Sequence, residues 1–288
     1  MNDTDPRPLP MDGKRVVIET DYALISLVPI SPGEAPRVEA FVRHERVPIE
    51  AHERGDSMRF EVSAVDPRGR PFWHEGPLRV VAHLAPGARV RAHTSAGKIV
   101  ANGVSGELDL ASDAGVIDLE SVTGTIRLAT SAGRIDGSNL SGSIEAESNA
   151  GAVRLEIAHL DPGTHSIQTN LGATRIELAR GMPVRVEART TMGSARVRFP
   201  SQHDAAAILS VTADVGAIRV RESSRAWVSP SAIVTAAGPF RTPSPPEHRE
   251  HDERPGATDE DLEKVLARVA SGELSPGDAR ELLRAMGI

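Results

Sequence analysis

Cysteine is absent from the 288 residues of this sequence, and aromatic side chains make up only 3% of them. Without cysteine, disulfides, thiol nucleophiles and cysteine-based zinc sites are all excluded. Hydrophobic residues still make up 39% of the chain. The core must therefore be built from isoleucine, leucine, valine and alanine.

Motifs for common chemistry and for membrane insertion are also missing. The patterns GxxxxGK[ST], GxGxxG, GxSxG and HExxH do not occur, so nucleotide and hydrolase chemistry have no recognisable motif. No window approaches about 18 apolar residues, and the first residues carry acids and prolines instead of a signal peptide's apolar stretch. The net charge of −7 argues against a specific nucleic-acid partner. We expect a cytoplasmic protein, or one peripheral to a membrane, with no cofactor and no metal.

A short phrase that contains glycine returns seven times in the middle of the chain, first as TSAGKI from residue 94. The spacings between its glycines are 18, 18, 18, 21, 21 and 23 residues. Three further glycines lie nine residues after the first three, so each of these repeats holds two strand-and-turn units. The main glycines are Gly97, Gly115, Gly133, Gly151, Gly172, Gly193 and Gly216, and the intermediate ones are Gly106, Gly124 and Gly142.

Apolar and charged residues alternate after these glycines. This period of two is typical of a strand with one buried face, and such short units bury that face only by stacking. We therefore predict an all-β fold, a right-handed parallel β-helix or solenoid. The expected inward residues are Ile99, Ile117, Leu119, Ile135, Val153, Leu155, Ile176, Val197, Ile218 and Val220, with Leu108, Leu110, Ile126, Leu128 and Ile144 in the half-repeats.

A row of serine and threonine precedes the glycines in the pattern [ST]-[SDN]-x-G. Small polar residues bond to nearby backbone and glycine adopts a positive φ, so the pattern predicts a turn with hydroxyls bonded to it. A regular threonine row can also order water in ice-binding proteins, but this row varies and lies at a turn. Its members are Thr94, Ser112, Thr130, Ser148, Thr169 and Thr190.

The series G-x-I-x-x-x-x-V-x-G-x-I-x-L-x-T-S-A-G, read between 97 and 133, resembles the putative-adhesin β-solenoid family of bacterial proteins. The segment LRVVAHLAPGARVRAHTSAG, from 78 to 97, is similar to the usual entry into the first rung of that family. The resemblance covers about 78 to 221. It implies the solenoid fold and brings no catalytic motif with it.

The flanks of the repeat divide the chain further. A solenoid end exposes unpaired backbone, which some structure must cover. We expect a disordered N-terminus over 1–13, a β-rich cap of irregular opening turns over 14–93, and the solenoid over 94–235. A Pro-rich, charged stretch over 236–257 is typical of a flexible linker, and 258–288 is typical of a small helical hairpin.

The hairpin is predicted from its caps and its apolar faces. Thr258 followed by Asp261 is a helix N-cap pattern, and Gly272 ends the first helix. The tail resembles the SHOCT-like short helical hairpins that accompany solenoids in envelope-stress proteins, although there the hairpin is often N-terminal. Two helices this short cannot hold a core by themselves, so we expect the hairpin to recruit a partner or to self-associate. The residues expected to dock are Leu262, Val265, Leu266, Val269, Leu282, Leu283 and Met286.

Charge is distributed unevenly along the repeats. Acidic residues predominate from 94 to 150, whereas nine basic and six acidic residues occupy 151 to 221. Stacked like charges repel, so the basic positions indicate either a docking strip for an anionic partner or a solvated face neutralised by Glu156 and Glu177. Arg154, Arg175, Arg196 and Arg219 share one outward position, and Arg198 and Arg221 lie two residues after the last two.

Three functions remain open at this point. The first is a non-enzymatic scaffold that binds a protein partner, or itself, through the hairpin or the solenoid ends. The second is a peripheral membrane or envelope-stress component that binds an anionic surface. The third is a carbohydrate-active β-helix enzyme using carboxylates such as Asp118 and Asp136. Because 94 to 198 holds no aromatic platform for sugar rings, we expect that the protein is not an enzyme.

Deletion of residues 241–288 tests this division of the chain. We expect the melting temperature of the solenoid to stay unchanged, because a flexible linker would decouple the two modules. Binding of a partner or self-association should be lost, which sedimentation of both forms would show. A lower melting temperature of the shortened protein would mean that the hairpin packs on the solenoid as a cap.

Overall fold

The computed structural model describes residues 6–9, 13–31, 33–42, 45–62 and 78–228. The chain divides into two units, 1–233 and 234–288, and the described residues all belong to the first. They form strands and contain no helix, so the predicted all-β class is confirmed. Within the same residues there is accordingly no helix that could cross a membrane. The predicted linker and hairpin lie outside the described residues.

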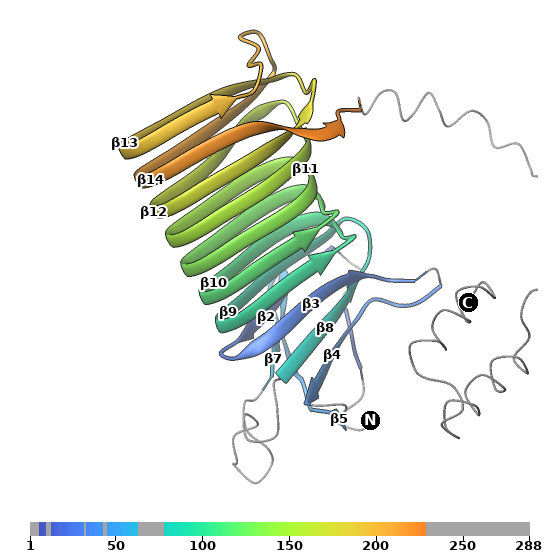
Figure 1. Cartoon of the computed structure of the whole chain (residues 1–288). Coiled ribbons are helices and arrows are strands. Elements are labelled where there is room, and N and C mark those ends of the chain that lie inside the picture. Colours follow the sequence, from blue (N-terminus) through green and yellow to red (C-terminus); the bar gives the residue numbers. More distant parts are fainter. Residues whose placement is uncertain (1–5, 10–12, 32, 43–44, 63–77, 229–288) are drawn as a thin grey trace, which may run out of the picture. The chain divides into compact units, whose positions relative to one another are not determined.

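Long strands stack side by side from residue 88 onward (Figure 1). They pair in parallel, and the glycines of one strand lie beside those of the next, as Gly115 beside Gly97 and Gly133 beside Gly115. The strands are β9 (Ala88–Asn102), β10 (Ser105–Glu120), β11 (Thr123–Leu160), β12 (Gly163–Arg180), β13 (Val184–Arg198) and β14 (Ala207–Ala226). The glycine repeat therefore sets the register of the stack.

The last two strands, β13 and β14, lie in the stack in the reverse of their sequence order. The spatial order ends β12-β14-β13, so β14 lies between β12 and β13 and pairs with both in parallel. Gly216 consequently lies between Gly172 and Gly193, although it follows both in the sequence. The edge of the sheet is thus β13 and not the last strand of the repeat.

The inward phase predicted from the alternation is confirmed. Ile117, Ile135 and Ile144 are fully buried, and the other expected inward residues are buried as well, with one exception. Val197 on β13 is 41% exposed, because it lies on the edge strand. Aliphatic residues form one continuous core along the stack.

Neighbouring rungs approach each other closely at the glycines. A Cβ on Gly133 would lie 2.0 Å from the carbonyl oxygen of Gly115, and one on Gly172 would lie 1.7 Å from that of Gly151. No side chain fits at such distances, so glycine is required at both positions by contact, and at Gly172 also by its positive φ of 144°. The requirement recurs from rung to rung and explains why the glycine is retained while the residues around it change.

The serine and threonine row lies inside the stack. Thr94, Ser112, Thr130, Ser148 and Thr169 are at most 4% exposed and occupy strand positions. Among the described residues, the hydroxyls of Ser112, Thr130, Ser148 and Thr190 find no hydrogen-bond partner, so the expectation that they bond to turn backbone is wrong for them. Burial also rules out the row as an ice-binding surface. The row pairs strand to strand, and this places small side chains where the chain bends.

The strands before residue 88 lie at the other end of the stack. Two of them, β2 (Arg15–Thr20) and β3 (Ala23–Pro29), pair with β9 in parallel and so continue the rung pattern. The region expected to hold irregular opening turns therefore contributes strands of regular register. Antiparallel strands follow them outward: β4 (Arg37–Val42) on β8 (Leu78–Leu84), and β6 (Glu50–Arg54) on β7 (Ser57–Glu61). The short strands β1 (Arg7–Pro8) and β5 (Glu45–Arg46) both pair with β4.

Replacing Ile117 by Asp should unfold the stack cooperatively, because a buried carboxylate without a partner costs several kcal/mol, on the order of the whole stability. Replacing the neighbouring Asp118 by Ser should cost less than about 1 kcal/mol, since it removes only an exposed ion pair with Lys98. Thermal melts of the two variants decide the matter. Equally mild effects would contradict the strand phase.

Replacing Gly133 by Ala should destabilise the protein by more than about 3 kcal/mol or prevent folding, because backbone would have to move on two rungs. The matched control is Ala132→Leu, a larger change one residue away. It should be tolerated, since the equivalent positions on later strands hold exposed Leu171 and Met192. Denaturant unfolding measures both, and a tolerated Gly133→Ala would refute the close approach.

Candidate functional site

Four arginines form one line across four strands, which we call the arginine row. Arg154 on β11 pairs in register with Arg175 on β12, Arg175 with Arg219 on β14, and Arg219 with Arg196 on β13. All four side chains are exposed. The predicted common outward position is therefore present, but its order in space is 154, 175, 219, 196. The sequence order differs because β14 lies between β12 and β13.

The arginine row is only partly neutralised. Arg154 lies 3.7 Å from a carboxylate oxygen of Asp136 on the preceding turn of the chain. Within the described part of the chain, Arg175, Arg219 and Arg196 have no carboxylate in ion-pair distance. Adjacent strands lie about 4.8 Å apart, so three stacked cations remain without a matched anion on neighbouring strands.

The two glutamates that could have neutralised the arginine row bind other groups. Glu177 forms an ion pair with Arg221, its register partner on β14. Glu156 accepts a hydrogen bond from the Ser223 hydroxyl at 3.2 Å and lies 3.9 Å from Arg225. The two glutamates therefore bind side chains outside the arginine row and do not neutralise the charge of the row itself. Arg198, the register partner of Arg221, has no carboxylate partner among the described residues.

A shallow hollow lies beside the arginine row. It has a volume of about 160 Å³ and is lined by Ala152, Ala173 and Ala217 together with three of the arginines. The alanines are register partners, one on each strand, and their small side chains leave the neighbouring guanidinium groups accessible. Planar, forked guanidinium groups pair bidentately with carboxylate or phosphate. The arrangement suits an anionic group that lies across the strands.

The same outward position is acidic on the earlier strands. Asp118 pairs in register with Asp136, and these two residues precede Arg154 in the repeat. Asp118 lies 2.8 Å from the Lys98 ammonium, and Asp136 forms an ion pair with Arg134. The acidic half of this line is thus compensated by cations on the strands, whereas the basic half beyond Arg154 is not.

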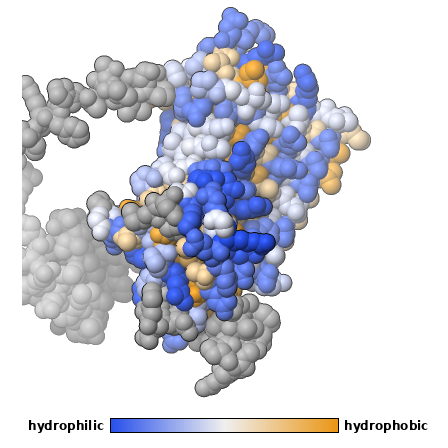
Figure 2. Space-filling view, turned by 180° about the vertical axis from the view of Figure 1, so that it is seen from behind, coloured by the Kyte–Doolittle hydropathy of each residue, from blue (hydrophilic) through white to orange (hydrophobic). Residues whose placement is uncertain are grey.

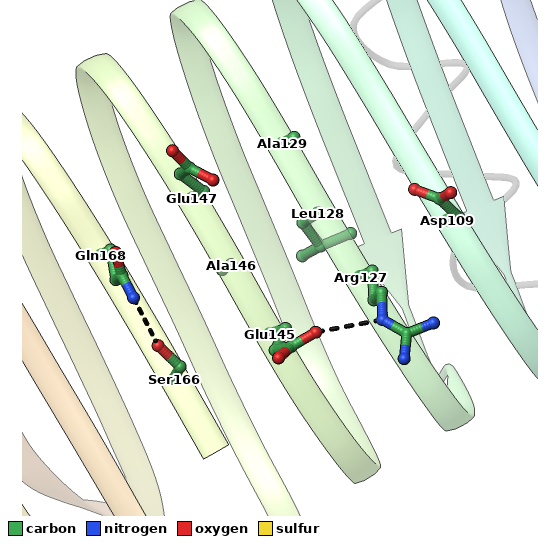
Figure 3. A pocket seen from close by; sticks show the side chains of 9 residues that line it. All are labelled: Asp109, Arg127, Leu128, Ala129, Glu145, Ala146, Glu147, Ser166 and Gln168. Atoms are coloured by element: carbon green, nitrogen blue, oxygen red, sulfur yellow. Dashed lines mark hydrogen bonds and ion pairs between the residues drawn. The ribbon is translucent and has the colours of Figure 1, made fainter. Parts of the chain in front are cut away.

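A larger hollow of about 310 Å³ lies over residues of β10, β11 and β12, and Figure 3 shows its side chains. Glu145 and Arg127 point toward each other across neighbouring turns at 3.0 Å, and the side chain of Gln168 donates to Ser166 at 3.1 Å. Asp109 and Glu147 complete its acidic lining. Among the described residues, no three histidine, aspartate or glutamate side chains are grouped so that they could hold a metal ion.

The expected docking residues of the hairpin cannot be placed on this surface. Leu262, Val265, Leu266, Val269, Leu282, Leu283 and Met286 all lie outside the described residues. They stay a prediction from the sequence.

The structure also shows a row of exposed hydrophobic side chains that the sequence argument missed. Leu171, Val215 and Met192 are register partners on the last three strands and are 54%, 41% and 65% exposed. Figure 2 shows hydrophobic side chains gathered at one margin of the upper strands. The sequence does carry a signal for this row: the residue before the main glycine is alanine in the first four repeats and a large apolar residue in the last three.

A buried histidine is a second feature that the sequence did not reveal. His165 is 1% exposed, its Nδ1 accepts the backbone N–H of Ile144, and its Nε2 lies 2.8 Å from the carbonyl oxygen of Asp161. It lies within the first of the longer, 21-residue spacings of the repeat, between Gly151 and Gly172. Its ring joins one turn to the next within the stack, which is a structural role.

Comparisons with known proteins add little to this picture. No family model matches the sequence, and no curated protein matches it. A crystal structure described as a putative cell adhesion protein from Clostridium sporogenes is similar over 76% of this chain and 98% of its own, with 8% sequence identity and a TM-score of 0.29. At that TM-score the similarity carries no argument about function.

Proposed function

We propose that this chain is a non-enzymatic interaction protein, a right-handed β-solenoid of the putative-adhesin kind, whose arginine row binds an acidic protein surface. The observation that carries the proposal is the stack of Arg175, Arg219 and Arg196 without carboxylate partners among the described residues. The repeat spacing and the parallel register support the solenoid.

The cost of stacked charges supports a binding role. Two unit charges about 4.8 Å apart repel by roughly 1 kcal/mol in water, and by more where protein displaces the solvent. The chain has a means of relieving such repulsion, since Glu177 neutralises Arg221 in the adjacent column. Because the row lacks this compensation, an external anion would lower its energy.

A second candidate is an anionic lipid surface. The exposed row Leu171, Val215 and Met192 favours it, because these side chains lie on the same three strands as the unpaired arginines. Basic and apolar side chains together are typical of proteins that lie on membranes. The envelope-stress role implied by the resemblance would fit this candidate.

Catalysis on carbohydrate is the least supported function. The hollow of about 310 Å³ holds Glu145 in an ion pair with Arg127, which ties up one of its three carboxylates. Residues 94 to 198 provide no aromatic side chain on which a sugar ring could stack. Recruitment through the C-terminal hairpin remains part of the proposal, and it rests on the sequence alone.

Changing Arg175, Arg219 and Arg196 together to Ser tests the proposal. Each arginine should contribute about 1 kcal/mol, so binding should weaken by about a hundredfold at low salt and the difference should shrink as salt rises. The control is the triple change Arg59→Ser, Arg91→Ser and Arg127→Ser, which alters the net charge equally at ion-paired positions. It should affect binding much less.

The probes are polyglutamate and vesicles with and without phosphatidylserine, each titrated with the full-length protein by light scattering or anisotropy. Binding to polyglutamate alone supports the acidic protein partner, and binding to anionic vesicles supports the lipid surface. If the native protein bound neither, or if the control triple weakened binding as much as the row triple, the arginine row would be only a solvated face.

A further inference from the structure

The edge strand β13 is open along most of its length. It is the last strand in the spatial order of the sheet, and the loop that follows it covers only its start. There Gln202 donates its N–H to the Val184 carbonyl, and Val186 donates its N–H to the Ser201 hydroxyl. Beyond Val186, no described residue outside the sheet bonds to the backbone of β13. Residues 191–198 are exposed without interruption.

The hydrophobic core is cut off at this edge. Val197 belongs to a column of inward residues in which Ile176 pairs with Val220 and Val220 with Val197. Ile176 and Val220 are at most 1% exposed, whereas Val197 is 41% exposed. One more strand beside β13 would bury Val197 as its predecessors are buried, and removal of this apolar side chain from water would favour binding.

The charged side chains on either side of Val197 also lack oppositely charged partners among the described residues. Arg196 and Arg198 flank it on the outward face, and neither has a carboxylate partner in the described part of the chain. Arg221 lies in the same column as Arg198, and Glu177 on the adjacent strand neutralises it. An acidic residue on a neighbouring strand can therefore neutralise an arginine in this column. A strand placed beside β13 would satisfy both arginines if it carried acids at the two facing positions.

We propose that the open edge of β13, over residues 193–198, binds an extended acidic segment of a partner protein by adding it to the sheet. The segment reads acidic–apolar–acidic. Its apolar side chain covers Val197, its two carboxylates face Arg196 and Arg198, and its backbone pairs with the free edge. Backbone pairing supplies affinity in this mode of recognition and the alternating side chains supply specificity.

The charge of the edge argues against a second copy of this chain as the occupant. The stretch from 189 to 198 holds three arginines and no acidic residue, so two such edges would bring cations together. Cationic side chains on an edge strand are a known means of preventing self-pairing. The same charges attract an acidic strand, so they discriminate between the two occupants.

The proposal does not rest on the arginine row, although Arg196 belongs to both. The row runs across the strands and is accessible to any anionic surface, whereas the edge requires an extended backbone. Arg198 and the backbone of β13 serve the edge alone, and Arg175 and Arg219 serve the row alone. Variants at these positions therefore separate the two.

The test uses the full-length protein and a synthetic peptide of about six residues that alternates glutamate and valine. Hydrogen exchange measured by mass spectrometry should show that the peptide slows exchange of amides within 193–198 and leaves those of β10 and β12 unchanged. A peptide that alternates lysine and valine is the matched control and should have no effect. Slow exchange of every amide within 193–198 in the protein without peptide would overturn the proposal, because the alternate amides that do not bond to β14 would then already be occupied.

Charge reversal gives an independent readout. Arg198→Glu should weaken binding of the glutamate peptide by at least tenfold and permit binding of the lysine peptide. Arg189→Glu is the control on the same strand, since Arg189 already lies near Glu187. The double change Arg175→Ser and Arg219→Ser should leave peptide binding unchanged. If it abolished binding, or if binding left exchange at 193–198 unaltered, the peptide would bind the arginine row and the edge proposal would fail.

Discussion

The close approach of backbone to backbone at the glycine positions is the constraint on which the rest of this structure depends. Each main glycine from Gly115 onward lies against the carbonyl oxygen of a glycine on the neighbouring rung, and Gly97 lies against that of Ala23, at distances that admit no Cβ. A strand that slipped by one residue would bring a side chain into that contact. The glycines therefore hold every strand in one register and make each position of the repeat a column through the stack.

Because positions become columns, a small change in the repeat has a large effect on the surface. The outward position that holds Asp118 and Asp136 on the earlier strands holds arginine on the later ones. Lys98 and Arg134 compensate the acids, but alanine and serine occupy the column beside the later arginines. The arginine row and its shallow hollow thus arise from the side chains of two neighbouring columns, one that holds arginine and one that holds alanine or serine. They require no special conformation of the local backbone.

Three features that a binding partner would satisfy lie together at the β13 end of the stack. In the part of the chain that the structure describes, the core column, the outward arginines and the backbone edge of β13 all lack a neighbour on the same side. The other end is different, because antiparallel strands follow the parallel ones there. Among the described residues, β13 is therefore an uncovered edge of the stack, and both proposed binding surfaces include residues of that edge.

The sequence by itself determined the all-β class, the inward phase of residues such as Ile117 and Ile135, and the common outward position of the four arginines. These follow from the period of two and from the glycine spacing, which are local properties of the chain. Sequence did not reveal that Ser112 and Thr130 are buried, because a polar residue before a glycine fits a turn and a bent strand equally well. Nor did it reveal that β14 lies between β12 and β13, that Glu177 binds Arg221, or that Val197 is exposed. Equivalent repeats carry the same pattern and can pair in more than one order, so only the tertiary structure decided which strand neighbours which, and with that which strand forms the open edge.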